Sequence, residues 1–172
     1  MIDRRTFLQS VAAAFTVGAA RIPADADTRD SQNKAELPGA SLNHVMIRVP
    51  DFEQAKSFYA EKFGFREVLS FNAVGRKPAF AYLQISRNTF LELQPASGEH
   101  PPGLGHIGLE LGNLEDAVKI LRQSGLTAQD IRVSHQTGAH ISSVQATPGV
   151  TFELLEFPPD SLVRKAMNSW NT

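Results

Sequence analysis

Two histidines and two glutamates occupy matching positions in two similar stretches of the sequence. His44 aligns with His106, and Glu92 aligns with Glu153, in a repeat of roughly 60 residues. Imidazole nitrogens and carboxylate oxygens are common ligands of divalent metals. The chain has no cysteine, which excludes thiol catalysis, zinc–thiolate sites, iron–sulfur clusters and disulfides. The four residues therefore indicate a divalent-metal site with nitrogen and oxygen ligands.

Alternation along the predicted strands places these four side chains on one face. Successive side chains of a strand point to opposite faces, and His44 and Arg48 alternate with Val45, Ile47 and Val49. The other three residues alternate with apolar sets of their own: Leu91 and Leu93; Ile107, Leu109 and Leu111; and Phe152 and Leu154. One such polar residue alone would be an ordinary side chain of a half-solvated sheet. Four at matched positions favour a cavity in which the polar faces meet.

Each stretch predicts one helix and four strands in the same order. Asp51 with Gln54, and Asn113 with Asp116, have the spacing of an N-cap and its partner at the start of a helix. Apolar alternation between turn signals predicts the strands. They are expected at residues 45–49, 65–71, 79–85 and 89–94, and then at 104–111, near 131, at 140–146 and at 150–157. The same supersecondary module is therefore used twice.

The length of 172 residues fits one domain that contains both modules. The predicted parts are module one (41–95), a linker (96–103), module two (104–157) and a C-terminal helix (158–172). Lys and Arg number 17 against 18 Asp and Glu, so no basic surplus points to a nucleic-acid partner. No apolar run is long enough for a membrane span. We therefore expect a small-molecule substrate.

Several segments resemble the vicinal oxygen chelate superfamily, which includes glyoxalase I, bleomycin-resistance proteins, methylmalonyl-CoA epimerase and extradiol dioxygenases. They are the strand-to-helix entry 44–51, Phe58-Tyr59, Phe63-Gly64-Phe65, the strand 106–110 and Phe152-Glu153-Leu154. The resemblance covers about residues 41–157. It implies an α+β fold in which paired βαβββ modules form a curved, mostly antiparallel eight-stranded sheet around a metal cavity. It also implies a homodimer, with the site formed either within one chain or across two.

The order of the four metal-ligand candidates resembles that of bacterial glyoxalase I. The resemblance implies one divalent ion, with Ni, Co, Zn, Mn or Fe as candidates, held by His44, Glu92, His106 and Glu153. It further implies that a metal-bound carboxylate transfers a proton, which makes Glu153 and Glu92 the catalytic candidates.

Three further residues are expected on the cavity face and are the candidates for substrate contact. They are Arg48, Gln94 and Tyr82. Arg48 would hold an anionic group of the substrate or pair with Glu110, which is its equivalent in the second module and is expected on the same face. Tyr82 would donate a hydrogen bond or pack in the core. No role is assigned to the remaining histidines, which are His100, His135 and His140.

These residues lead to the hypothesis of a metal-dependent, glyoxalase-like lyase or isomerase that moves a proton next to a carbonyl. Its substrate would be small and would present adjacent oxygens to the metal. One alternative is an extradiol-type ring-cleaving dioxygenase, but its iron centre uses two histidines and one carboxylate, and Glu92 is a second carboxylate. The other alternative is a non-catalytic small-molecule binding protein of the same fold.

The first 26 residues have the features of an export signal. Arg4 and Arg5 precede a weakly apolar stretch, and Ala24-Asp25-Ala26 forms a small-x-small cleavage site. This segment resembles a twin-arginine signal peptide, which predicts a periplasmic or secreted protein. The alternative is an amphipathic helix of the folded domain. Residues 27–40 are polar and are expected to form a flexible lead-in. An exported enzyme meets little cytosolic thiol, so a glutathione adduct is not the expected substrate.

Overall fold

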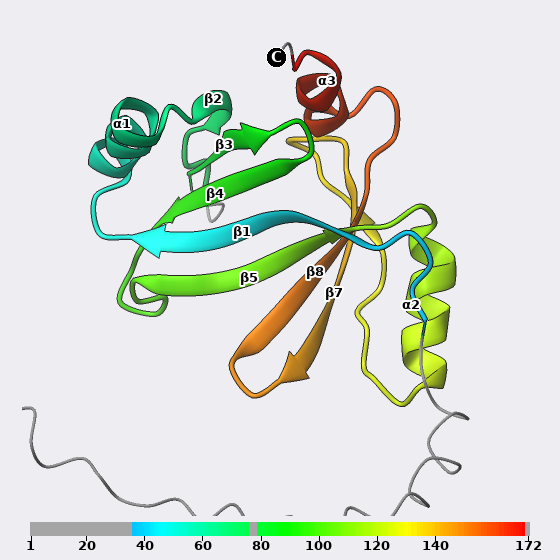
Figure 1. Cartoon of the computed structure of the whole chain (residues 1–172). Coiled ribbons are helices and arrows are strands. Elements are labelled where there is room, and N and C mark those ends of the chain that lie inside the picture. The colour runs from blue at the N-terminus through cyan, green and yellow to red at the C-terminus, as the bar shows by residue number, and fades with distance from the viewer. Residues whose placement is uncertain (1–35, 76–78, 171–172) are drawn as a thin grey trace, which may run out of the picture. The chain divides into compact units, whose positions relative to one another are not determined.

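One eight-stranded sheet and three helices make up the computed structural model, which describes residues 36–75 and 79–170 (Figure 1). The strands are β1 (Ser41–Val49), β2 (Arg66–Phe71), β3 (Phe80–Ser86), β4 (Thr89–Pro95), β5 (Gly103–Glu110), β6 (Arg132–Val133), β7 (His140–Thr147) and β8 (Val150–Glu156). The helices are α1 (Phe52–Phe63), α2 (Leu114–Gln123) and α3 (Leu162–Asn168). The predicted signal segment, residues 1–26, and most of the lead-in lie outside the described residues.

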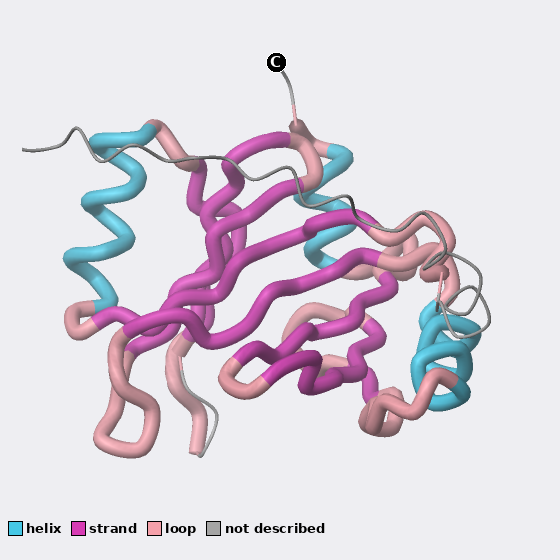
Figure 2. The backbone as a smooth tube through the Cα atoms, turned by 60° about the horizontal axis from the view of Figure 1, so that its bottom comes forward, coloured by secondary structure: helices cyan, strands magenta, loops and turns pink. Residues whose placement is uncertain are grey.

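The strand order, β2-β3-β4-β1-β5-β8-β7-β6, joins two equivalent halves in the middle of the sheet. β1 pairs with β4 in parallel, and β5 pairs with β8 in the same way. The other neighbouring pairs are antiparallel, including β1 with β5 at the centre, where the two strands run side by side in Figures 1 and 2. The predicted α+β fold, with paired βαβββ modules in a mostly antiparallel sheet, is confirmed.

Both long helices begin at the residues that the sequence indicated. Asp51 Oδ1 accepts a hydrogen bond from Gln54 N–H at 2.9 Å, and Asn113 Oδ1 accepts one from Asp116 N–H at 3.0 Å. Gly64 ends α1 with a φ of 70°, a left-handed conformation that glycine adopts without strain. The expected starts of both helices are therefore confirmed.

The helices α1 and α2 cover the apolar face of the sheet. Leu83, Leu93 and Val49 are buried under α1, with Phe52 and Tyr59 packed against them. The corresponding cluster under α2 contains Leu111, Leu114, Ala117, Val118, Leu121, Ala128, Val144 and Leu154. Most of the apolar positions predicted from alternation, among them Ile47, Leu93 and Leu109, thus pack under the two helices.

The opposite face, which carries the histidines and glutamates, also contains a hydrophobic core. Phe90 and Leu155 lie two residues from Glu92 and Glu153, so they share the polar face, and α3 covers them. The buried members of this cluster are Tyr82, Phe90, Ala139, Ile141, Leu155, Phe157, Val163, Ala166 and Met167. The face that carries the four metal-ligand candidates is therefore also packed against a hydrophobic cluster.

The strand bounds expected from the sequence agree with those of the structure to within a few residues. Ser161 caps α3, which ends at Asn168 and lies within the segment 158–172 expected to contain a C-terminal helix. Among the described residues, no helix is both long enough and apolar enough to cross a membrane.

Candidate metal centre

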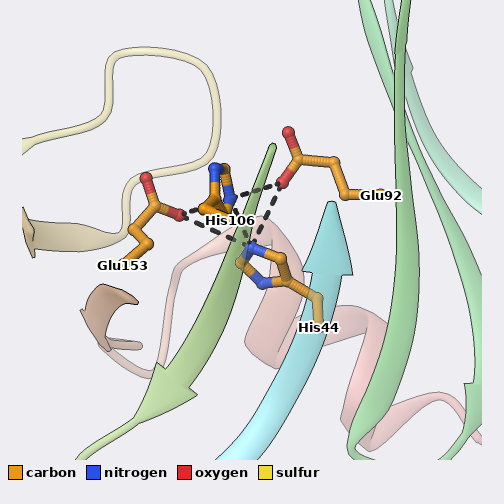
Figure 3. Close-up of side chains that lie close together, drawn as sticks. All are labelled: His44, Glu92, His106 and Glu153. Atoms are coloured by element: carbon orange, nitrogen blue, oxygen red, sulfur yellow. Dashed lines mark hydrogen bonds and ion pairs between the residues drawn. The ribbon is translucent and has the colours of Figure 1, made fainter. Parts of the chain in front are cut away.

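Four neighbouring strands contribute one ligand candidate each, and the four side chains point at one another (Figure 3). They are His44 on β1, Glu92 on β4, His106 on β5 and Glu153 on β8. One ligand atom from each lies within 4.8 Å of the other three. All four belong to one chain, so the site needs no second copy to complete it.

The sheet must curve strongly to bring these groups together. Neighbouring strands lie about 4.8 Å apart, so β4 and β8, separated by two strands, are about 14 Å apart along a flat sheet. The Glu92 and Glu153 carboxylates nevertheless flank the same pair of imidazoles. Glu92 Oε2 is 3.3 Å from His44 Nε2, and Glu153 Oε2 is 3.6 Å from the same nitrogen. The curved sheet that the family resemblance implied is what forms the site.

His44 is fully buried, and its ring is held in the neutral form. Asn43 Nδ2 donates to the backbone oxygen of Asn88, so Asn43 Oδ1 faces His44 and accepts a hydrogen bond from Nδ1–H at 3.0 Å. This bond leaves Nε2 unprotonated and directed at the centre. Burial lowers the pKa of His44 to about 4, and His106 adds to this shift while Glu92 opposes it.

Gly108 on β5 makes room for the His44 ring. A Cβ atom at Gly108 would overlap the imidazole, which fills the space over the β5 backbone. A glycine is therefore required at this position if His44 is to reach the centre.

His106 completes a nitrogen pair at the centre. Its Nε2 lies 2.9 Å from His44 Nε2 and 3.6 Å from both carboxylates. Burial disfavours the charged imidazole, but Glu92 and Glu153 outweigh it and raise the pKa of His106. Two carboxylates and two imidazole nitrogens around one partly buried point need a positive charge to balance them. This donor set fits a divalent cation.

The two carboxylates differ in what holds their second oxygen. Glu92 Oε1 accepts a hydrogen bond from Gln94 Nε2 at 2.8 Å, whereas Glu153 Oε1 has a looser ion pair with Arg132 Nη2 at 3.7 Å. Burial acts to raise the pKa of Glu92, but His106, His44 and Gln94 lower it. Burial raises the pKa of Glu153 to about 7; His106 opposes this shift and the Glu92 carboxylate adds to it. Glu153 is the carboxylate with the freer oxygen.

A cavity of about 440 Å³ opens beside the ligands and exposes Glu92, His106 and Glu153. Its apolar wall contains Phe80 and Tyr82, and its polar wall is the segment 132–137. Its volume is in the range of small-molecule sites. Burial, with the charges of Glu92 and Glu153, raises the pKa of Tyr82 well above its usual value, so its hydroxyl stays protonated.

The structure places two of the three substrate-contact candidates in the cavity lining. Gln94 and Tyr82 line the cavity, but Arg48 does not. Glu110, the other partner considered for Arg48, instead forms an ion pair with Arg164 of α3 at 2.6 Å.

Three residues that the sequence left without a role have a place in the site. Arg132 and His135 line the cavity, and Asn43 orients His44. Asn43 directly precedes His44 in the sequence. This adjacency is the feature that could have suggested its role in orienting the imidazole. Arg132 belongs to a two-residue strand, which is too short for alternation to assign a face. His100 lies in an exposed turn, and His140 Nδ1 is 3.9 Å from Glu156.

Comparisons with known proteins agree on the fold. The model of the "Glyoxalase/Bleomycin resistance protein/Dioxygenase superfamily" matches residues 41–154. The uncharacterized protein YwkD of Bacillus subtilis is 28% identical over 126 residues, which cover 67% of this chain and 96% of that protein. Mitochondrial methylmalonyl-CoA epimerase of Mus musculus is 30% identical over 112 residues, 58% of this chain and 60% of the relative. The structure of methylmalonyl-CoA epimerase from Mycobacterium tuberculosis has a TM-score of 0.60 at 21% identity, covering 69% of this chain and 88% of that one.

Proposed function

The chain belongs to the glyoxalase/bleomycin resistance protein/dioxygenase superfamily, and we propose that it is a divalent-metal-dependent isomerase or lyase that moves a proton next to a carbonyl group. The observation that carries this proposal is the convergence of two imidazoles and two carboxylates at the floor of an open cavity. His44, Glu92, His106 and Glu153 would hold the ion. A bound divalent ion supplies charge stabilisation to a substrate oxygen as a neighbouring carbon loses its proton.

Glu153 is the residue that accepts the proton in this proposal. Glu153 lines the cavity and no described residue donates a hydrogen bond to its Oε1, which lies 3.7 Å from Arg132 Nη2, whereas Glu92 Oε1 accepts one from Gln94. A carboxylate that touches the substrate carbon through a free oxygen can take a proton and return it. Glu92 remains the alternative base, and its bond to Gln94 favours a role as a fixed ligand. Tyr82, protonated at neutral pH, offers a hydrogen-bond donor at the opposite wall.

The named relatives support an isomerase within this superfamily. Methylmalonyl-CoA epimerases occur both among the sequence relatives and among the similar structures. An epimerase inverts a carbon centre, and proton removal and return next to a carbonyl is one way to do so. This similarity favours proton transfer over ring cleavage. It leaves the substrate of this chain to be found by experiment.

Solvent-deuterium exchange tests the proposal most simply. Metal-loaded protein is incubated in deuterated buffer with a panel of CoA thioesters and hydroxy-carbonyl compounds, and mass spectrometry measures deuterium at the carbon next to the carbonyl. We expect exchange with at least one compound, a loss of about 100-fold or more in Glu153→Gln, and no change in Glu99→Gln, which alters an exposed linker residue. No exchange across the panel, with oxygen uptake from a catechol and Fe(II), would indicate a dioxygenase instead. Recovery of unaltered ligand from every reaction would indicate a binding protein.

We also propose that the protein is exported by the twin-arginine route, on the strength of Arg4 and Arg5 and the apolar stretch after them. That route carries folded proteins, so the metal would be bound before export. Replacing both arginines by lysine should retain the precursor in the cytoplasm, as measured by cell fractionation. Unchanged export of the double variant would contradict the proposal.

A further inference from the structure

We infer that the cavity selects substrates that carry an anionic group and that Arg132 binds this group. The inference rests on the proposed metal-dependent function and adds a substrate class to it. The substrate would be a small molecule with oxygens for the metal and a separate carboxylate or similar anion. Three observations support it. They are the position of Arg132, the charges around the cavity, and the backbone hydrogen bonds that fix the segment after Arg132.

Arg132, the first residue of β6, brings its guanidinium to the edge of the metal ligands. Its Nη2 is 3.7 Å from Glu153 Oε1, and 63% of its side chain is exposed. Among the described residues that line the cavity, it is the only arginine or lysine. Charge-assisted hydrogen bonds are shorter than this contact, at about 2.7–2.9 Å, and a guanidinium has five N–H donors. Arg132 therefore keeps donors free for a ligand.

The charges around the cavity favour an anion. Glu92 and Glu153 are the only carboxylates among the described residues that line it. Two carboxylates offset the two positive charges of a divalent ion, and imidazoles that bind a metal are neutral. Arg132 then adds one positive charge to a partly enclosed space, where charges interact more strongly than in bulk water. A ligand with one negative charge near Arg132 is the electrostatic complement.

The segment that follows Arg132 is already ordered by backbone hydrogen bonds. Gly138 N–H donates to Ser134 O at 2.8 Å, and this bond closes a tight turn. Leu162 N–H, at the start of α3, donates to Thr137 O at 2.8 Å, which ties the turn to the helix. A wall that is fixed before binding loses little conformational entropy when a ligand arrives. The site for the anion is therefore preorganised, apart from the Arg132 side chain itself.

Arg48 is the competing arginine, and its position argues against it. It is paired in register with Gly103 of β5 and does not line the cavity. A Cβ atom at Gly105 would come within 3.3 Å of its guanidinium carbon, so Arg48 lies along the β5 backbone. The two arginines therefore predict different outcomes for one binding experiment.

The experiment uses two hydroxamates that differ only at the end remote from the metal-binding oxygens. N-hydroxysuccinamate ends in a carboxylate, and N-hydroxybutanamide ends in a methyl group. Each is titrated calorimetrically into the Ni-loaded full-length protein and into Arg132→Gln, Arg48→Gln and Arg87→Gln variants. Arg87 lies in the exposed turn between β3 and β4, so its variant controls for the loss of one positive charge.

We expect the wild type to bind the carboxylate probe about ten-fold more tightly than the methyl probe. Arg132→Gln should bring the two affinities within about two-fold of each other, with the methyl probe unchanged, whereas Arg48→Gln and Arg87→Gln should keep the preference. Equal binding of both probes by the wild type would overturn the inference. So would loss of the preference in Arg48→Gln instead of Arg132→Gln. An equal loss for both probes in Arg132→Gln would show that this residue acts only through Glu153, and would also overturn it.

The same measurements separate this inference from the proposed function. If neither probe binds the wild type, the metal centre and the inference fail together. If the carboxylate preference holds but no deuterium exchange occurs with any compound, the proposed reaction fails and the anion site stands.

Discussion

The two halves of the candidate metal centre differ in the burial and the hydrogen-bond partners of their side chains. His44 and Glu92, from module one, form the first half-site, and their side chains are 0% and 6% exposed. His106 and Glu153, from module two, form the second half-site, and theirs are 16% and 15% exposed. Neutral amides of Asn43 and Gln94 hydrogen-bond to the first pair, whereas Glu153 in the second pair lies 3.7 Å from the exposed guanidinium of Arg132. In the proposed function, the first half-site would anchor the ion and the second would meet the substrate.

The repeat shows which substitutions produced this difference. At equivalent positions, module one has Asn43 and Met46, and module two has Gly105 and Gly108. Asn43 orients His44, but Gly105 has no side chain that could orient His106. Gly108 admits the His44 ring, and the Met46 side chain lies over Gly105. Two modules with the same fold therefore place their ligands in unlike surroundings.

Removing each histidine should give the largest contrast between the half-sites. His44→Ala leaves Asn43 Oδ1 without its donor and a cavity where the fully buried ring was, so we expect a loss of about 3 kcal/mol in the free energy of unfolding as well as loss of metal binding. His106→Ala should also lose metal affinity, but its stability should stay within about 1 kcal/mol of the wild type. Urea denaturation of the metal-free proteins measures both. Equal destabilisation by the two changes would contradict the contrast.

Adding one methyl group to β5 should give the next largest difference in stability between the two half-sites. Gly108→Ala forces its Cβ against the rigid, buried His44 ring, which predicts a destabilisation of about 2 kcal/mol and weaker metal binding. Gly105→Ala meets the flexible ends of the Met46 and Arg48 side chains and should lose less than about 1 kcal/mol. Thermal unfolding with and without added Ni measures both variants. A larger loss in Gly105→Ala would show that the His44 ring can move aside.

The hydrogen bond from His44 to Asn43 should have a smaller effect, which metal affinity shows most directly. Asn43→Ala removes the group that fixes the ring and its tautomer, and we expect Ni affinity to fall by about 30-fold. Asn88→Ala is the matched control, because Asn43 donates to the backbone oxygen of Asn88 and not to its side chain. Competition with a chelator gives both affinities. An unchanged affinity in Asn43→Ala would mean that packing alone orients His44.

The pH dependence of metal binding should be the smallest effect and should arise in the second half-site. With a pKa of about 7, Glu153 is largely protonated at pH 6 and largely ionised at pH 8, so a bound ion must displace more protons at the lower pH. Ni affinity should therefore fall by about ten-fold from pH 8 to pH 6, and Glu153→Gln should flatten this dependence. His44, with a pKa of about 4, stays neutral throughout this range. A dependence that persists in Glu153→Gln would assign the titration to His106.

The sequence predicted the modules and the ligands because both depend on short-range periodicity. Period-two alternation assigns Glu92 and Glu153 to the face opposite Leu93 and Leu154, and the repeat brings the two glutamates into correspondence. The helix starts followed from side-chain caps at Asp51 and Asn113. None of these features requires knowledge of how distant segments pack.

The parts that the sequence did not predict depend on contacts between distant segments. Phe90 shares a face with Glu92, and only the return of α3 across that face buries it. Arg132 reaches the cavity because the segment after it is tied to Leu162 at the start of α3. Arg48 satisfies the alternation rule but lies beyond the cavity lining, since a shared face does not fix the distance to the site.

Metal stoichiometry tests the central claim most directly. Protein purified without chelators is titrated with Ni, Co, Zn, Mn and Fe(II) under oxygen-free conditions, and bound metal is measured by mass spectrometry beside a folded His44→Ala/His106→Ala double variant. The four-ligand centre predicts one ion per chain for the wild type and none for the double variant. A folded wild-type protein that binds none of these ions, or a double variant that still binds one, would contradict it.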